Sequence, residues 1–532
     1  MSRAPFDRSL NWLHAADNRG LLCQGLRGFE KECLRVGPDG RLSMAPHAPA
    51  FGSALTHPWI TTDYSEALLE FVTPPLKTSE AGIDFLADLH AFVYRHAGGE
   101  LLWPASMPCI IAADESVPIA QYGSSNEGRL RTIYRSGLGY RYGRPMQAIA
   151  GTHFNYSLPA DFWPAYREHR GSALEAVAFR SESLMGLVRN FRRCGWLVTY
   201  LYGASPAFCK SFRPQGHARL ESLNADTWYA PWSTSLRMSD MGYRNTTQAR
   251  LAISVNSLDE YLAELEAALT TVDPRYAAIG IVVDGEYRQL NANILQIENE
   301  YYSSIRPKPK SKSPRLIAAL RASGVEYLEI RTLDLNPFAA VGVAPEQAQL
   351  IELLLLACLL EPSPPISPAE QEEIDRRELA VAWEGRKPGM TLPHRGGTTA
   401  LAEIAREILD RLSALAPLLD RDGKDYPAAL AAAAEAVRDP AATLSARMLD
   451  GLDGGRRTFF DWAFGIAASR REEFLARRFA PGRLEELEAV ATASREEVAA
   501  LEAAAEPPFP EYLERLLASG IGEGSRPAHR IL

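Results

Sequence analysis

Two glutamates spaced two residues apart interrupt an apolar pattern near the N-terminus. An extended strand alternates its side chains between two faces, so Glu30 and Glu32 share one side with the apolar Leu34. Two carboxylates on such a side are costly unless cations or hydrogen bonds compensate them. The pattern fits a pair of structural salt bridges, and it also fits a metal site. The other side of this strand carries Arg27, Lys31 and Arg35, which we expect to be solvated.

A second acidic cluster occupies residues 63–74. If this segment is a strand, Glu66 and Glu70 lie on one face, and if it is a helix, Asp63, Glu66 and Glu70 form one stripe. Both geometries bring carboxylates together among apolar residues. An ordinary acidic first turn of a helix is the alternative.

Two further segments alternate like strands and carry polar groups. In 147–159, His153 and Asn155 lie opposite the apolar Phe154, and a lone histidine of this kind is often only structural. In 326–337, Glu329 and Arg331 share a face. They form either a plain ion pair or a metal ligand beside an arginine that clamps phosphate oxygens. Residues 290–300 are predicted to form another strand edged with acids.

Several strands of one sheet must position these groups, and the rest of the chain supplies helices. Residues 361–368 contain four prolines, after which Ser367 begins a helix with a capping box. Beyond that point the composition favours helices, which are predicted over 369–384, 399–419, 427–438, 458–479 and 484–505. The chain is therefore divided into a mixed α and β part, 1–361, and a mainly helical part, 362–532.

The composition excludes several classes of protein. The chain has 532 residues, 46% hydrophobic content and a net charge of −9, which suits a globular protein and disfavours a nucleic-acid binder. The one basic stretch, 306–315, is predicted to be a solvated loop, and a role near an anionic ligand is the alternative. Six scattered cysteines suit a reducing cytoplasm, and no signal peptide or membrane span is predicted.

The candidate site favours magnesium and phosphate chemistry. Carboxylates with little histidine and no paired cysteines suit Mg²⁺, which carboxylates commonly share with substrate phosphates. The chain has neither a P-loop nor a dinucleotide-binding fingerprint. An ATP site here must therefore be built from metal ions and arginines on a sheet.

Long ordered blocks give the chain a resemblance to the proteobacterial-type glutamate–cysteine ligases, which catalyse the first step of glutathione synthesis. These blocks run from about Leu10 to Leu360, and the resemblance continues more weakly to about Arg447. They include Gly28–Val36, Gly52–His57, Trp59–Asp63, Trp103–Pro108, Leu201–Pro206, Leu295–Glu300 and Ile305–Lys308.

The resemblance implies a fold and a reaction. The fold is α+β, a curved, mainly antiparallel sheet that forms a funnel, as in the catalytic half of glutamine synthetase, with outer helices and a helical C-terminal region. The reaction joins the γ-carboxylate of L-glutamate to the amine of L-cysteine through γ-glutamyl phosphate, with ATP and two or three Mg²⁺ ions. A monomer in the cytoplasm, without nucleic-acid or membrane partners, is expected.

The resemblance also implies roles for individual residues. The metal shell it implies is Glu30, Glu32, Asp63, Glu70, His153 and Glu329. Arg331 resembles the phosphate-stabilising arginine, and Arg237 resembles a catalytic, substrate-binding arginine. The acceptor pocket it implies is Tyr64, Tyr134, Leu138, Gln147, Tyr243 and Tyr302. Lys31 and Tyr64 depart from the arginine and phenylalanine expected in close relatives, and the Tyr64 hydroxyl bears on the choice of acceptor.

Other functions remain open from the sequence alone. A ligase of the same fold could join glutamate to a different amine. A non-catalytic binding protein on this scaffold should have a broken acidic shell. Nucleic-acid binding has only the basic stretch 306–315 in its favour.

Overall fold

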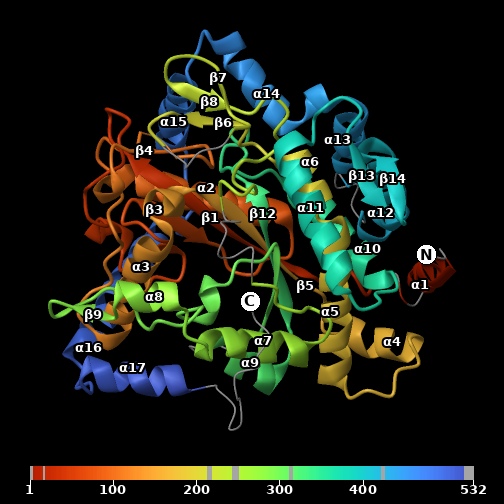
Figure 1. The fold of residues 1–532 in the computed structure, drawn as a ribbon, viewed down its shortest axis with the longest axis horizontal. Coiled ribbons are helices and arrows are strands. Elements are labelled where there is room, and N and C mark those ends of the chain that lie inside the picture. Colours follow the sequence, from red (N-terminus) through yellow and green to blue (C-terminus); the bar gives the residue numbers. More distant parts are fainter. Residues whose placement is uncertain are drawn as a thin grey trace.

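The computed structural model describes residues 4–15, 18, 20–108, 110–212, 218–242, 251–310, 315–420 and 426–519. Its centre is one sheet to which seven described strands contribute, in the order β11-β12-β5-β1-β3-β2, with β4 also paired to β1. These strands are β1 Leu26–Val36, β2 Ile60–Thr62, β3 Leu68–Val72, β4 Leu101–Leu102, β5 Gly151–Ser157, β11 Ile305–Lys308 and β12 Tyr327–Asp334. The long strands β1, β5 and β12 cross the middle of the molecule (Figure 1).

All neighbouring strands of the central sheet run antiparallel. The predicted strands that carry Glu30, His153 and Glu329 are confirmed. In the second acidic cluster the strand alternative holds for Glu70 in β3, whereas Asp63 lies in the turn between β2 and β3. The strand predicted over 290–300 is wrong, because this segment is made of bends and a short 3-10 helix, Glu298–Glu300.

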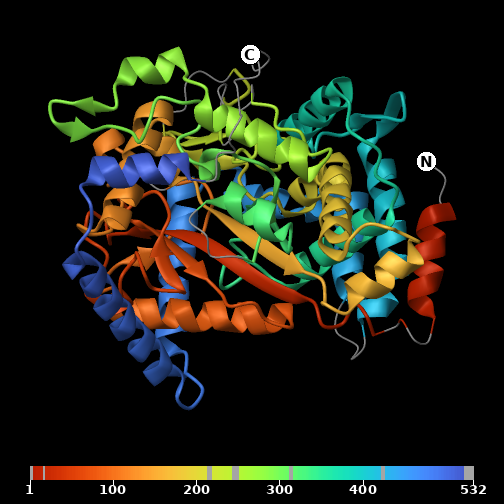
Figure 2. The same ribbon diagram turned by 90° about the horizontal axis from the view of Figure 1, so that it is seen from below.

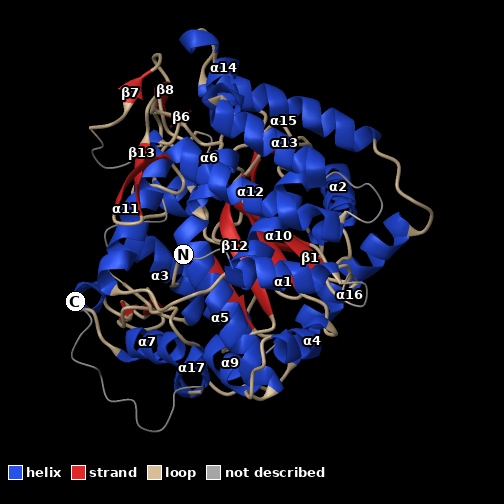
Figure 3. Cartoon of the chain, turned by 90° about the vertical axis from the view of Figure 1, so that its right-hand side faces the viewer, coloured by secondary structure: helices blue, strands red, loops and turns tan. Residues whose placement is uncertain are grey.

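Helices surround the sheet, so the strands lie inside a helical shell (Figure 3). The helices that precede the proline-rich connection are α1 Ala4–His14, α2 Ser79–His96, α3 Asn126–Tyr142, α4 Phe162–His169, α5 Ala176–Cys194, α6 Trp196–Tyr202, α7 Leu258–Thr270, α8 Pro274–Ile279, α9 Leu316–Ser323 and α10 Pro345–Leu360. Figure 2 shows α2, in orange, lying along the sheet. It packs so closely that a Cβ atom added at Gly82 would lie 2.5 Å from the Phe29 ring of β1.

The C-terminal region is helical, as predicted. Its helices are α11 Pro368–Glu384, α12 Leu401–Leu419, α13 Tyr426–Arg438, α14 Leu444–Gly451, α15 Phe459–Ala476, α16 Arg483–Ala503 and α17 Phe509–Ala518. The Ser367 side chain accepts a hydrogen bond from the Glu370 amide and so caps α11, with Pro368 at the first helical position. Helices α12 and α13 pack on α10, and α15 packs on α2.

Three small sheets lie outside the central one. They are β6 Ala207–Cys209 with β7 Glu221–Ser222 and β8 Thr227–Tyr229, β9 Val282–Val283 with β10 Glu286–Tyr287, and β13 Thr391–His394 with β14 Gly397–Ala400. Within the described ranges, no helix combines the length and the apolar character needed to cross a membrane.

The basic side chains of β1 correct the sequence prediction. Arg27, Lys31 and Arg35 were expected to be solvated, but they are 5%, 3% and 1% exposed. Strand alternation assigns each side chain to a face, and helices such as α2 cover the second face of this sheet as well. Lys31 does point away from the acidic side, toward His90 of α2, as its position in the alternation requires.

Candidate active site

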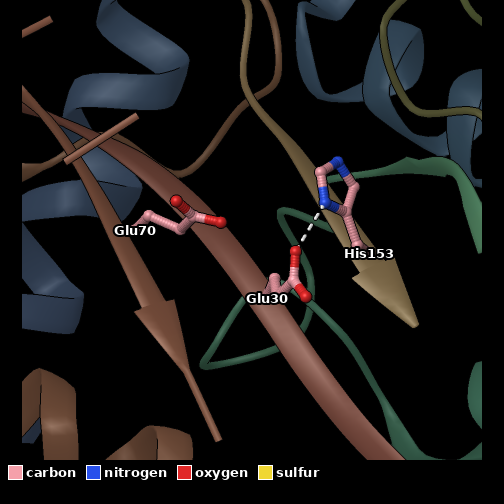
Figure 4. A group of neighbouring side chains, drawn as sticks. All are labelled: Glu30, Glu70 and His153. Atoms are coloured by element: carbon pink, nitrogen blue, oxygen red, sulfur yellow. Dashed lines mark hydrogen bonds and ion pairs between the residues drawn. The ribbon is translucent and has the colours of Figure 1, made fainter. Parts of the chain in front are cut away.

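Antiparallel register brings the carboxylates of β1 and β3 and an imidazole of β5 together. Glu32 stands opposite Glu70 of β3, and Glu30 stands opposite His153 of β5. Cross-strand partners on one face lie within side-chain reach of each other. One ligand atom from each of Glu30, Glu70 and His153 lies within 4.8 Å of the others (Figure 4).

His153 is hydrogen-bonded into the carboxylate cluster. Its Nδ1 atom lies 3.1 Å from a Glu30 oxygen and 3.3 Å from a Glu329 oxygen, and its Nε2 atom lies 3.7 Å from Glu32. Burial and the nearby Arg331 oppose protonation, but the bonds to Glu30 and Glu329 and the charge of Glu32 raise the pKa of His153 to about 9. The imidazole therefore carries a proton when carboxylates alone surround it.

At the acidic end of the site the protonated His153 compensates only part of the carboxylate charge. Burial and the charge of Glu329 oppose ionisation of Glu30, but the His153 hydrogen bond and the Lys308 charge outweigh them and lower the pKa of Glu30. Burial and the charges of Glu30, Asp63 and Glu32 raise the pKa of Glu70 to about 8. Burial and the Asp63 charge also raise the pKa of Glu32, although its carboxylate accepts the Gly151 amide at 2.6 Å. Carboxylates that raise one another's pKa values in this way are suited to binding a cation.

The opposite end of the site is basic. Glu329 is buried beside three cations, with Lys308 Nζ 3.3 Å away, Arg306 at 3.9 Å and a short hydrogen bond from Arg331. Burial opposes ionisation of Glu329, but these cations hold its pKa well below the usual range. Arg331 keeps its charge, because Glu329, Glu30 and Glu32 raise its pKa despite burial.

The two ends share one cavity of about 280 Å³. The metal-shell residues predicted from the sequence all line it, and so do Arg331 and five predicted pocket residues: Tyr64, Tyr134, Leu138, Gln147 and Tyr302. The sixth predicted pocket residue, Tyr243, lies outside the described residues. Glu66, which belongs to the same acidic cluster in sequence, instead accepts the amides of His47 and Gln121.

Arg237 lies behind the cavity and does not line it. Its side chain is fully buried, donates to the Arg331 carbonyl at 2.9 Å and lies 3.5 Å from Asp334. Gly151 leaves the space it needs, since a Cβ atom there would lie 2.1 Å from the Arg237 guanidinium. Arg237 reaches the site through its neighbours, and Glu32 is the carboxylate of the site that feels its charge.

The sequence prediction missed several cavity residues. Arg306 and Lys308 belong to the stretch that we expected to be a solvated loop, but they form β11, and that expectation is wrong for these two residues. The basic run was the signal, and its alternative interpretation, a role near an anionic ligand, matches their place in the cavity. Arg135 was also missed, as were Tyr142 and Glu300, which are hydrogen-bonded to each other at 2.8 Å. The sequence gave no signal for Arg135 and Tyr142, whereas Glu300 belongs to the acidic run 290–300 that was predicted to be a strand.

Comparison with known proteins identifies the relatives of this chain. A family model described as glutamate-cysteine ligase matches residues 10–381. A glutamate–cysteine ligase from Alcanivorax borkumensis is 46% identical over 516 residues, 95% of this chain and 98% of the relative. One from Azotobacter vinelandii is 45% identical over 525 residues, 98% of this chain and 99% of the relative.

Solved structures agree with these sequence matches. The crystal structure of a Francisella tularensis glutamate–cysteine ligase in complex with AMP has a TM-score of 0.88 and 32% identity, and covers 93% of this chain and 98% of that one. A bifunctional glutathione synthetase from Pasteurella multocida has a TM-score of 0.68 and 23% identity, and covers 92% of this chain and 57% of that one. That second likeness concerns the fold, and both support the predicted α+β class.

Proposed function

This chain belongs to the glutamate–cysteine ligase family, and on that premise we propose how its residues carry out the ATP-dependent joining of glutamate to cysteine. The reaction itself, the first step of glutathione synthesis, follows from the family. The observation that carries the assignment of residues is the polarity of the cavity. Carboxylates that His153 compensates only in part stand at one end, and Arg331, Lys308 and Arg306 stand at the other.

The acidic end fits magnesium. Its donors are carboxylate oxygens with one imidazole, which suits a hard cation, and the raised pKa of Glu70 supports a site where further negative charge is unfavourable. The residues that would hold two or three Mg²⁺ ions are Glu30, Glu32, Asp63, Glu70 and His153, together with Glu329, which lies beside the cations of the basic end. When bound there, the ions would neutralise the charge of the ATP phosphates. His153 must give up its proton in order to bind a metal.

The basic end fits the phosphates of ATP. A carboxylate is a poor electrophile because its leaving group would be oxide, so the γ-phosphoryl group of ATP is first transferred to the glutamate side chain. The Arg331 guanidinium is positioned to meet the charge that develops on the transferring phosphoryl oxygens. Lys308 and Arg306 supply further positive charge on the same side.

The cysteine amine then attacks the carbonyl carbon of γ-glutamyl phosphate, phosphate leaves, and the amine loses a proton. Tyr64, Tyr134, Leu138, Gln147 and Tyr302 line the cavity where this acceptor would lie. The Tyr302 hydroxyl contacts the Met238 sulfur at 3.2 Å, and the Arg237 Nη1 atom lies 3.4 Å from the same sulfur. This shared contact couples Arg237 to the acceptor side, which supports its assignment as a substrate-positioning residue.

The organisation of the chain is part of the same proposal. A ligase core, 1–361, carries the site, and the helical region 362–532 supports it through the packing of α12 and α13 on α10. The sparse cysteines favour the cytoplasm. We place the enzyme there as a monomer.

A phosphate-release assay tests the assignment of substrates. Purified enzyme with ATP, Mg²⁺ and glutamate should release phosphate faster when cysteine is added than with any other amino acid or polyamine. A ligase for a different amine would respond to that amine instead. An absence of stimulation by cysteine over glutamate alone would overturn the assignment.

A further inference from the structure

Two cysteines far apart in sequence meet between helices α5 and α10 of the core. The Sγ atoms of Cys194 and Cys358 lie 3.4 Å apart, although 164 positions separate the residues. Cys194 ends α5 and Cys358 lies in the last turn of α10, and these two helices pack against each other. Both thiols are free. Bonded sulfurs lie about 2 Å apart, so a small side-chain adjustment would be enough to join them.

The pair lies at the junction between the core and the C-terminal region. The Asn190 side chain of α5 donates to the carbonyl of Cys358 at 2.8 Å and to the carbonyl of Glu361 at 3.2 Å, at the start of the proline-rich connection. The Cys194 thiol donates to the Asn190 carbonyl at 3.2 Å. The contacts that fix the end of α10 therefore also fix the positions of the two sulfurs.

We propose that Cys194 and Cys358 form a reversible intramolecular disulfide by exchange with a small-molecule disulfide. The proposal is independent of the metal and substrate site, since neither residue lines that cavity. In a reducing compartment such a bond is transient and depends on the local ratio of thiol to disulfide. The product of this enzyme is itself a thiol on the route to glutathione, so the oxidant RSSR would be the disulfide form of such a small-molecule thiol.

The two thiols have different roles in the exchange. Cys358 is buried, and burial together with the Cys194 thiol raises its pKa well above the usual value. Cys194 is partly exposed and meets the external disulfide RSSR first. Its thiolate attacks one sulfur, which forms a mixed disulfide and expels one RS⁻. Cys358 then loses its proton and attacks the Cys194 sulfur, which expels the second RS⁻ and leaves an internal disulfide with two thiols, RSH, released overall.

Peptide mapping of the oxidised full-length enzyme tests this proposal. The native protein is incubated with oxidised glutathione, the free thiols are alkylated, and the digest is analysed by mass spectrometry without reduction. We expect a cross-linked peptide pair that joins Cys194 to Cys358, lighter by two hydrogen atoms, or about 2 Da, than the two thiol peptides together, and cleaved by dithiothreitol. Recovery of both cysteines as alkylated thiols would overturn the proposal.

Two variants separate the roles of the two thiols. Cys358→Ser should stop at the mixed disulfide on Cys194, and Cys194→Ser should leave Cys358 unmodified because it is buried. Fast modification of Cys358 in the Cys194→Ser variant would contradict the proposed order. Cys209→Ser is the matched control, since Cys209 is buried in strand β6 and belongs to neither α5 nor α10. This variant should form the cross-link as the wild type does.

Discussion

The central sheet buries charged side chains on both of its faces: the covered face, on which α2 and α10 pack, and the cavity face, which lines the site. The two faces differ in how far the buried charges are compensated. On the covered face, Arg27 of β1 bonds both oxygens of Glu352 in α10, and it also donates to the carbonyls of Gly25 and Lys77. The Tyr426 hydroxyl donates to the same Glu352 carboxylate at 2.9 Å. The Arg27 and Glu352 charges are therefore paired with each other.

Lys31 on the covered face contacts a histidine instead of an acid. Its ammonium group contacts His90 Nε2 at 3.1 Å, and burial lowers the pKa of both groups. His90 Nδ1 is fixed by the Leu86 carbonyl at 2.7 Å. The covered face therefore either pairs a charge or favours its neutral form.

On the cavity face, the carboxylates of β1 and β3 are only partly compensated by neighbouring cations. Glu32 and Glu70 stand side by side in the register, and their pKa values are raised by burial and by neighbouring acids. Buried charge alone does not mark a functional site, because the covered face has it too. Carboxylates that raise one another's pKa values are better evidence of such a site, and we propose that a cation belongs beside them.

The largest expected effect comes from removing a carboxylate on the cavity face. Glu32→Gln should lower kcat by about a thousandfold, or about 4 kcal/mol in activation free energy, because a metal ligand is lost. The thermal unfolding midpoint in magnesium-free buffer should stay the same or rise, because repulsion within the shell falls. Steady-state kinetics and a thermal melt check both.

Lys31→Met is the matched control, one position away on the opposite face of the same strand. It should keep turnover within about threefold of the wild type, because Lys31 faces α2. Normal Mg²⁺-dependent turnover in the Glu32→Gln variant would remove Glu32 from the metal shell.

Breaking the pair on the covered face should have the reverse outcome. Glu352→Gln should destabilise the fold by about 3 kcal/mol, because it leaves the buried Arg27 charge uncompensated, while the folded fraction keeps its kcat. Urea denaturation measures the first effect, and kinetics at low temperature measure the second. The double variant Arg27→Met with Glu352→Gln should recover part of the loss. A loss of kcat as large as that of Glu32→Gln, with the fold intact, would erase the contrast between the faces.

Arg331→Met should act on the chemical step. A loss of about a hundredfold in kcat, or about 2.7 kcal/mol, is expected with little change in the KM for glutamate, since the charge that Arg331 meets develops in the transition state. Arg331→Lys should restore part of the rate by keeping the charge without the forked geometry. If KM rises while kcat holds, Arg331 binds the ground state instead.

A smaller effect should come from His57, a buried base whose pKa is shifted by burial. Its Nδ1 atom accepts the amides of Trp59 and Ile60, and burial lowers its pKa from 6.5 to about 4. The unfolded chain therefore binds a proton that the folded one rejects, so stability is complete above about pH 6.5 and falls as the pH drops toward 4. The loss from pH 7.5 to pH 5 should be about 2 kcal/mol for this group.

Urea denaturation of the wild type and of His57→Asn at the two pH values measures this contribution. The asparagine oxygen can accept the same amides but does not titrate, so the variant should show a shallower dependence on pH. An equal slope in both proteins would mean that other groups cause the acid instability.

The sequence predicts the cavity face better than the covered face. Alternation alone placed Glu30, Glu32 and Glu329 on site-facing sides of strands, and the resemblance joined them to Asp63, Glu70 and His153. Alternation could not reveal that Arg27, Lys31 and Arg35 are buried, because exposure depends on helices that pack there from elsewhere in the chain.

The acids of 290–300 show a second limit. They suggested a strand edge, but Glu298 binds Arg315 at 2.9 Å and Glu300 binds Arg141 at 2.9 Å. These acids hold turns against α3 and the segment before α9. Their partners lie on other elements, and strand periodicity contains no information about them.

Direct measurement of Mg²⁺ binding tests the central claim, that the partly compensated carboxylates on the cavity face form a metal shell. The full-length wild type, Glu32→Gln, Glu70→Gln and the Lys31→Met control are titrated with MgCl₂ in a calorimeter, in the presence of ADP. We predict that the wild type and the control bind Mg²⁺ alike, and that the two glutamine variants bind it at least about a hundredfold more weakly. Equal Mg²⁺ affinity in all four proteins would contradict the account.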